Sequence, residues 1–206
     1  MARVWMHNGY VVVNGEKMSK SLGNFFTVRQ LLEEGYPGEA IRLTLLSAHY
    51  RQPLDVTREK IDASKAQLDR LYQALRRVEA VEASDGDVAN LTAALCDDLN
   101  TPEALSHLHA VANALNNETV EAEQARLKAM LLKGGKLLGL LEQDPEAWFK
   151  GSEADGEAEE IEALIARRTE ARKDRDFAEA DRIRDELDAR GIVLEDGPGG
   201  TTWKRG

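Results

Sequence analysis

Two lysines three residues apart, Lys17 and Lys20, share a short polar segment with the hydroxyl groups of Ser19 and Ser21. The segment has almost no apolar periodicity and contains Gly23, so we predict an exposed loop. Ammonium groups and hydroxyl donors on such a loop can surround a polyphosphate and stabilise the charge that develops as pyrophosphate leaves a nucleotide. An exposed basic turn has the same composition, and the GxxxxGK spacing of a P-loop does not occur.

The histidines and the lone cysteine do not have the spacing of a metal site. His107 and His109 lie two apart on a predicted helix and therefore point to different faces. Cys96 cannot form an internal disulfide, and its acidic neighbours offer no base or cation to activate it, so we interpret it as a half-buried structural thiol. His7 and His49 add no ligand pattern. We therefore predict no metal site.

The charge balance limits the classes of partner. The chain of 206 residues has 27 basic and 37 acidic side chains, so its formal charge is 27 − 37 = −10, which argues against nonspecific nucleic-acid coating. Residues 1–80 hold 12 basic and 9 acidic side chains (+3), whereas residues 81–206 hold 15 and 28 (−13). No segment has the roughly 18–20 consecutive apolar residues of a membrane span, and no signal peptide is evident. We expect a cytoplasmic protein with no membrane partner.

The patterns around the loop predict a mainly α fold. Short strands, with Asn8-Gly9 as a turn signal, precede the loop, and Thr27 with Gln30 forms a capping box for the next helix. In the longest helix, Ile61, Leu68 and Leu75 form a seven-residue seam for packing against antiparallel helices. We predict helices over residues 28–34, 39–50, 57–81, 88–97, 103–115, 118–141, 159–173 and 177–190, and a final β-hairpin over 192–194 and 201–203.

The string Lys17–Ser21 is the KMSKS signature of class I aminoacyl-tRNA synthetases, and Leu-Gly-Asn follows it. The flanking sequence resembles that of the bacterial cysteinyl-tRNA synthetases. The resemblance spans essentially the whole chain and is weakest between residues 84 and 150. It rests on Trp5–Gly9, Asn24–Arg29, Arg42–Arg51, Ala171–Lys173, Glu179–Leu187, Leu194–Pro198 and Thr201–Trp203.

The resemblance implies an ATP site, with magnesium, at this loop. Lys20 would contact ATP and stabilise the transition state of adenylate formation, and Lys17 would be the second catalytic lysine, assisted by Met18, Ser19 and Ser21. The family's HIGH motif and its zinc ligands do not occur in this sequence. The resemblance therefore implies a C-terminal portion that needs the remainder of the catalytic domain, is inactive alone and carries no zinc ligands.

The resemblance also implies that the C-terminal segment binds the anticodon. By matching the family's motif, Arg172, Asp181 and Asp196 are candidates for hydrogen bonds to anticodon bases, with Phe177 and Trp203 as stacking partners. The charged side chains could instead be solvated helix charges. The two aromatic rings could instead be the core of a small domain, which is the interpretation we favour for them.

We expect four regions. Residues 1–38 end a catalytic domain and carry the KMSKS loop, 39–150 form an antiparallel helical bundle of the DALR type, 151–158 form an acidic linker, and 159–206 form a small α+β anticodon-binding domain of two helices and a β-hairpin.

We predict part of a monomeric cysteine-tRNA ligase, which joins cysteine to the cysteine tRNA. Two alternatives remain. A non-catalytic helical interaction module would use the seam and the acidic C-terminal part, but it does not account for the loop. A related cysteine ligase acting on an amino-sugar shares the KMSKS loop but lacks an anticodon-binding domain.

Overall fold

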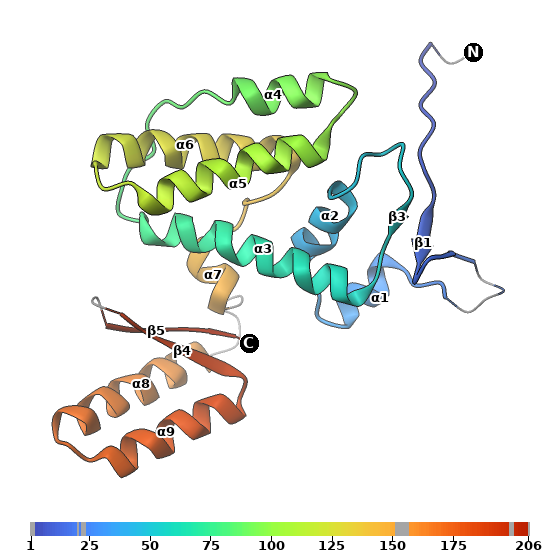
Figure 1. The fold of residues 1–206 in the computed structure, drawn as a ribbon. Helices are drawn as coiled ribbons and strands as arrows, with labels where there is room; N and C mark the ends of the chain where they lie inside the picture. Colours follow the sequence, from blue (N-terminus) through green and yellow to red (C-terminus); the bar gives the residue numbers. More distant parts are fainter. Residues whose placement is uncertain (1–2, 20, 22–23, 151–156, 198–199, 206) are drawn as a thin grey trace. The chain divides into compact units, whose positions relative to one another are not determined.

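The computed structural model describes residues 3–19, 21, 24–150, 157–197 and 200–205. Within these residues the fold is mainly helical with two small sheets, which confirms the predicted fold class (Figure 1). The chain divides into two compact units, Met1–Glu142 and Gln143–Gly206. No helix in the described part is both long enough and apolar enough to cross a bilayer.

A small sheet leads into the KMSKS segment. Strands β1 (Val11–Val13) and β2 (Glu16–Lys17) are antiparallel, and β3 (Leu54–Asp55) pairs with β1 in parallel. Asn14 and Gly15 form the tight turn, with φ values of 54° and 78°, a conformation that these two residue types tolerate well.

The expectation that Asn8-Gly9 forms the turn is wrong. The backbone N–H of Gly9 donates a hydrogen bond to the carbonyl of Tyr50 at 2.7 Å. A Cβ atom at Gly9 would lie 2.2 Å from the carbonyl oxygen of Gln52. This glycine therefore permits a close approach between the segment before β1 and the turn at residues 50–52, and it does not reverse the chain.

Helix α1 (Val28–Glu33) follows the KMSKS segment and begins at the predicted capping box. The backbone N–H of Gln30 donates to the Thr27 hydroxyl at 3.1 Å, and the Gln30 side chain accepts from the Thr27 N–H at 2.7 Å. Both bonds satisfy groups that a helix N-terminus leaves without intrahelical partners. Helix α2 (Gly38–Leu46) comes next and contributes Ile41 and Leu43 to the core.

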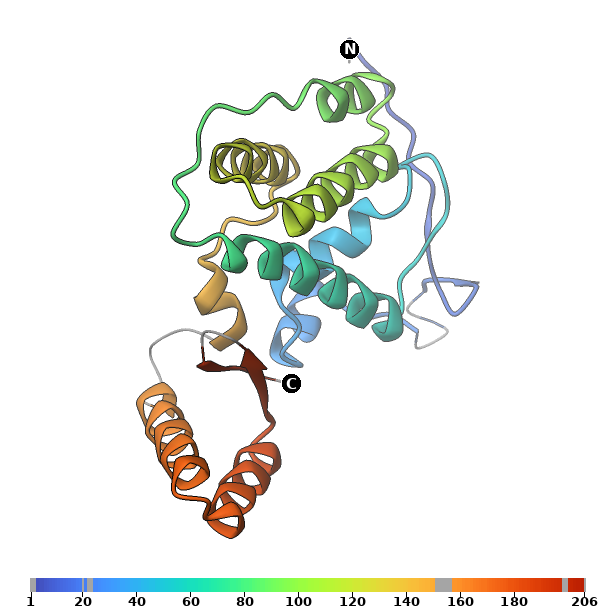
Figure 2. The same cartoon turned by 60° about the vertical axis from the view of Figure 1, so that its left-hand side comes forward.

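Four further helices complete the bundle of the first unit: α3 (Arg58–Arg77), α4 (Ala89–Cys96), α5 (Thr101–Asn117) and α6 (Glu121–Leu138). Helix α5 packs against α3, α4 and α6, and α2 packs against α3 (Figures 1 and 2). The predicted seam is confirmed, since Ile61, Leu68 and Leu75 are all buried. Helix α5 is capped by Asn100, whose side-chain oxygen accepts a hydrogen bond from the Glu103 N–H.

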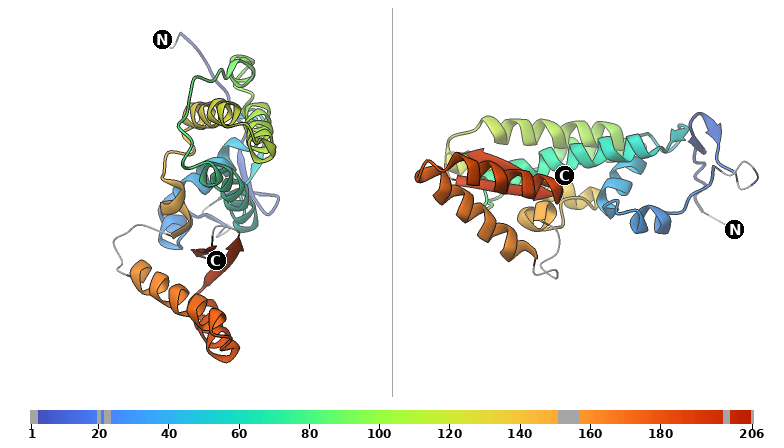
Figure 3. Two further views of the ribbon diagram at one scale, coloured as in Figure 1. Left: turned by 90° about the vertical axis from the view of Figure 1, so that its left-hand side faces the viewer. Right: turned by 90° about the horizontal axis from the view of Figure 1, so that it is seen from below.

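The second unit contains α7 (Pro145–Lys150), α8 (Glu157–Lys173), α9 (Phe177–Ala189) and the antiparallel hairpin of β4 (Ile192–Gly197) and β5 (Gly200–Arg205). Helices α8 and α9 pack side by side, and α7 packs against β5 (Figure 3). Helix α7 was not predicted from the sequence. The core of this unit consists of Ile161, Leu164, Ile165, Ile183, Leu187, Ile192 and Trp203.

Candidate nucleotide loop and nucleic-acid interface

Asn24 organises the described part of the KMSKS loop. Its side-chain oxygen accepts a hydrogen bond from the backbone N–H of Ser19 at 2.8 Å, and its amide group donates to the Lys17 carbonyl at 3.4 Å. The hydroxyl groups of Ser19 and Ser21 are 2.8 Å apart. Lys20, the leading candidate from sequence, lies outside the described residues.

Lys17 lies at the end of β2 and is exposed. Its Nζ atom is 5.9 Å from the centre of the Tyr10 ring, a distance typical of a cation–π contact. The backbone N–H of Met18 donates to the Val11 carbonyl at 3.2 Å, so the hairpin fixes the start of the loop. An exposed ammonium group and two hydroxyl groups on one short segment are donors that fit phosphate oxygens.

In the second unit, the carboxylate of Asp196 on β4 accepts hydrogen bonds from three side chains. Arg168 contacts both carboxylate oxygens at 3.2 Å, the Thr201 hydroxyl donates at 2.6 Å, and Arg172 donates at 3.1 Å. The hydrogen bonds from Arg168 and Thr201 hold the pKa of Asp196 well below its usual value, so it is ionised.

Two of the predicted base-contacting residues, Arg172 and Asp196, are therefore in direct contact. Arg168 is nearly buried, whereas the side chain of Arg172 is 52% exposed. Arg168 was not among the residues predicted from the sequence. The four-residue spacing from Arg168 to Arg172 was the available signal, because residues i and i+4 share one helix face.

The remaining candidates lie elsewhere in the unit. Asp181 on α9 is exposed and 3.5 Å from Arg184. Phe177, the first residue of α9, is 63% exposed, so the core interpretation favoured for it is wrong. Trp203 is fully buried and its indole N–H donates to Glu162 at 2.9 Å, so this ring belongs to the core and is not available for stacking.

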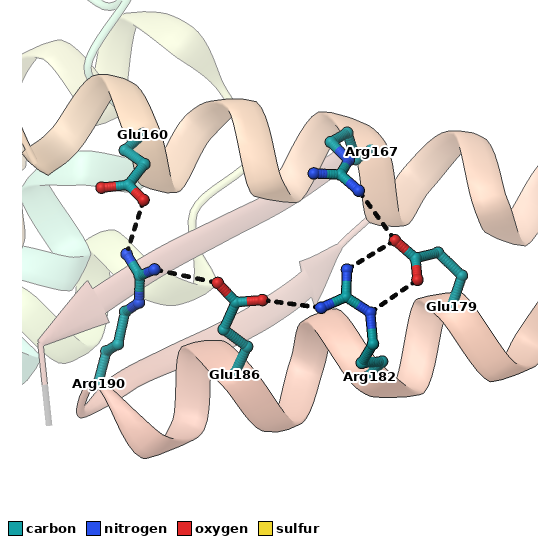
Figure 4. A network of polar contacts seen from close by, with 6 residues as sticks. All are labelled: Glu160, Arg167, Glu179, Arg182, Glu186 and Arg190. Carbon is teal, nitrogen blue, oxygen red and sulfur yellow. Dashed lines mark hydrogen bonds and ion pairs between the residues drawn. The ribbon is translucent and has the colours of Figure 1, made fainter.

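A network of alternating charges links α8 and α9 (Figure 4). Along it, ion pairs of 2.8–3.2 Å join consecutive members, and the network crosses between the helices at both ends. The contact with Arg182 lowers the pKa of Glu179. This charge ladder, which was not predicted from the sequence, consists of Glu160, Arg190, Glu186, Arg182, Glu179 and Arg167.

In the described part of the chain, no three His, Cys, Asp or Glu side chains are grouped so that they could hold a metal ion. Cys96 is exposed and not half-buried as predicted.

Three family models match separate parts of the chain. Residues 1–66 match a model described as the catalytic domain of tRNA synthetases class I (C), residues 90–142 match a DALR domain, and residues 154–203 match a cysteinyl-tRNA ligase anticodon binding domain.

Curated relatives match the chain over nearly its full length. The chain is 61% identical over its full length to a cysteine–tRNA ligase of Paramagnetospirillum magneticum, of which it covers 46%. It is 56% identical over 99% of its length to the same enzyme of Rhodospirillum rubrum, of which it covers 45%. The chain thus spans about half the length of these relatives.

A solved structure supports the fold. The LeuRS of Agrobacterium radiobacter K84, from a ternary complex with tRNA and LeuAMS, matches 64% of this chain with a TM-score of 0.53 and 22% identity, and 20% of that chain is covered. The fold and the matched models define part of a class I aminoacyl-tRNA synthetase. Within that class, the chain belongs to the cysteine–tRNA ligase family and corresponds to its C-terminal portion, as the resemblance implied.

Proposed function

We propose that this chain supplies the KMSKS loop and the anticodon-binding part of an enzyme that activates cysteine with ATP and transfers it to the cysteine tRNA. The observation that carries the proposal is the Asp196 cluster, which lies inside the segment matched by the anticodon-binding model. The cluster places an ionised acceptor beside an exposed arginine. That pair offers both an acceptor and a donor to base edges.

We assign the proposed roles by exposure, because only exposed side chains can contact a base. Arg172 and Asp196 face solvent sufficiently to hydrogen-bond anticodon bases, and Asp181 is a further exposed acceptor. Exposed Phe177 offers a stacking surface for an unpaired base. Specificity would arise from these directed contacts, since the acidic composition of the chain disfavours nonspecific phosphate binding.

The loop proposal concerns ATP and its magnesium ion. ATP would supply the adenylyl group and pyrophosphate as leaving group. Lys17, with Ser19 and Ser21, would bind phosphate oxygens, and the hydrogen bonds of Asn24 would keep this segment in a binding shape. The role of Lys20 rests on the family resemblance.

The first unit also offers a surface for the remainder of the catalytic domain, which we propose as a partner. Val4, Trp5 and Met6 are large apolar side chains and are all more than half exposed. They precede β1, inside the segment that matches the catalytic-domain model. Burying such a row of apolar side chains is what an interface of this kind would do.

The test is tRNA binding with a matched anticodon control. Filter binding should show tighter binding of the chain to the cysteine tRNA than to the same tRNA with a substituted anticodon. Arg172→Ala should weaken binding to the first by about 1–3 kcal/mol and reduce the difference between the two RNAs.

The neighbouring Lys173→Ala is the control, because Lys173 pairs with Glu170 and lies outside the Asp196 cluster. It should change the affinity for both RNAs equally. Equal binding of the unsubstituted chain to both RNAs would contradict the proposal and favour a protein-interaction module.

A further inference from the structure

A polar pocket of about 300 Å³ lies between α3 and α5, in the unit that does not contain the anticodon candidates. Leu71 and Ala112 are buried and form its apolar lining. The rest of the lining is polar and contains no carboxylate. These polar residues are Gln67, Arg70, His109, Asn113 and Asn116.

Arg70 provides a positive charge that other side chains do not neutralise. It is exposed, and no Asp or Glu in the described part of the chain forms an ion pair with it. An unpaired guanidinium group offers its planar set of donors to an anion.

His109 adds a second group that responds to charge. Its Nε2 atom is 3.1 Å from the Gln67 side-chain oxygen, which only accepts, so Nε2 carries the proton and donates. Burial and the charge of Arg70 lower the pKa of His109. An anion bound between Arg70 and His109 would offset the effect of the Arg70 charge and raise the pKa of His109. It would do so because it attracts both the guanidinium group and the protonated imidazole.

We propose that this pocket binds a phosphate group through Arg70, with the side-chain amides of Gln67, Asn113 and Asn116 as further donors. Arginine and amide donors match the several acceptor oxygens of a phosphate, and the lack of a lining carboxylate removes the main source of repulsion. A metal cation would be repelled by Arg70. The phosphate could belong to an RNA backbone or to a free phosphate ester, and the experiment distinguishes these sources.

The first measurement is an NMR titration of the full chain with inorganic phosphate at constant ionic strength. The His109 ring signals, assigned by their loss in His109→Asn, should shift saturably, and Arg70→Gln should abolish the shift. Lys136→Gln removes an exposed charge from α6, outside the pocket, and should leave the shift unchanged. Circular dichroism would confirm that each variant is folded.

The second measurement is the salt dependence of binding to a transfer RNA. If the ligand is an RNA phosphate, log affinity should fall less steeply with log salt in Arg70→Gln, with the absolute value of the slope smaller by about one. An unchanged slope together with a saturable phosphate shift would assign the site to a free phosphate ester. Absence of a saturable His109 shift with both phosphate and RNA would overturn the proposal. The anticodon variants test a different unit, so the two proposals can fail separately.

Discussion

At the scale of single residues, Asp196 shows how one carboxylate can be both fixed and available. Arg168 is nearly buried and contacts both oxygens, so it sets the orientation of the carboxylate. Arg172 makes a single contact from an exposed position. A base could therefore displace or join Arg172 while Arg168 stays in place. We interpret Arg168 as a positioning residue in the proposed anticodon site.

Replacing Arg168 tests that interpretation. Arg168→Gln should weaken binding to the cysteine tRNA by about 1–3 kcal/mol, because the acceptor loses its orientation. It should also raise the pKa of Asp196 toward 3.8, since the largest stabilising contact is removed. Carboxyl NMR titration measures the pKa, and Arg168→Lys should restore it in part. An unchanged pKa in a folded Arg168→Gln variant would refute this role.

Asp98 provides a pH prediction in the first unit. Hydrogen bonds from Arg51 and Tyr50 lower its pKa from 3.8 to about 2. A carboxyl group with a lower pKa in the folded state adds stability above its unfolded value, and this is lost as pH falls through the folded value. Asp98→Asn should therefore destabilise the chain near neutral pH.

Urea denaturation at a series of pH values measures this effect. The stability difference between the wild-type chain and Asp98→Asn should be constant above about pH 5 and shrink between pH 3.8 and about 2. A difference that is the same at both ends of this range would show that the charge of Asp98 does not matter.

At the scale of elements, local patterns were sufficient where local contacts decide the structure. The Thr27 capping box involves residues three apart, and the seam of α3 needs only a seven-residue period, so both were predicted. Strand β3 was missed because its two residues become a strand only by pairing with β1, more than forty positions away. Helix α7 is too short for a periodic signal.

In the candidate site, too, the features that depend on contacts between distant residues were not predicted from the sequence. The resemblance identified Arg172 and Asp196 as separate positions, but their contact depends on the packing of β4 against the helices. The exposure of Phe177 and the burial of Trp203 also depend on that packing. Residue type alone could not separate these two aromatic rings, because both are large enough to form the core of a small domain.

Gly134 in α6 tests how closely the helices of the bundle pack. A Cβ atom there would lie 2.9 Å from methyl groups of both Leu108 and Leu91, so Gly134→Ala forces these side chains to move. We expect a loss of about 1–3 kcal/mol in the free energy of unfolding. Gly38→Ala is the control, because its nearest neighbour would lie 3.9 Å away. A Gly134→Ala variant as stable as Gly38→Ala would contradict the packing argument.

At the scale of the whole molecule, the chain has two compact units, and each has its own hydrophobic core. The core cluster of the second unit includes Ile161, Ile183 and the fully buried Trp203, and Phe149 of α7 is also buried. Helix α7 packs against β5 of the same unit. These contacts make the second unit self-sufficient.

A fragment of residues 143–206 should therefore fold by itself. We expect a cooperative thermal transition by circular dichroism, and tryptophan emission that shifts to longer wavelength on unfolding as Trp203 becomes exposed. Ile183→Ala removes a fully buried side chain and should lower the transition temperature, whereas exposed Asp188→Ala should not. A gradual, non-cooperative transition of the fragment would show that its stability depends on the first unit.

The charge ladder between α8 and α9 should shorten the time for which an RNA stays in contact with this surface. Its three arginines and three glutamates pair along the surface, so the positive charges that could retain a phosphate backbone are already matched. A face with little net field gives a colliding RNA a short dwell time, because few counterions are released on contact. In the function proposed above, such brief encounters would let the chain sample many similar tRNAs before the correct one binds.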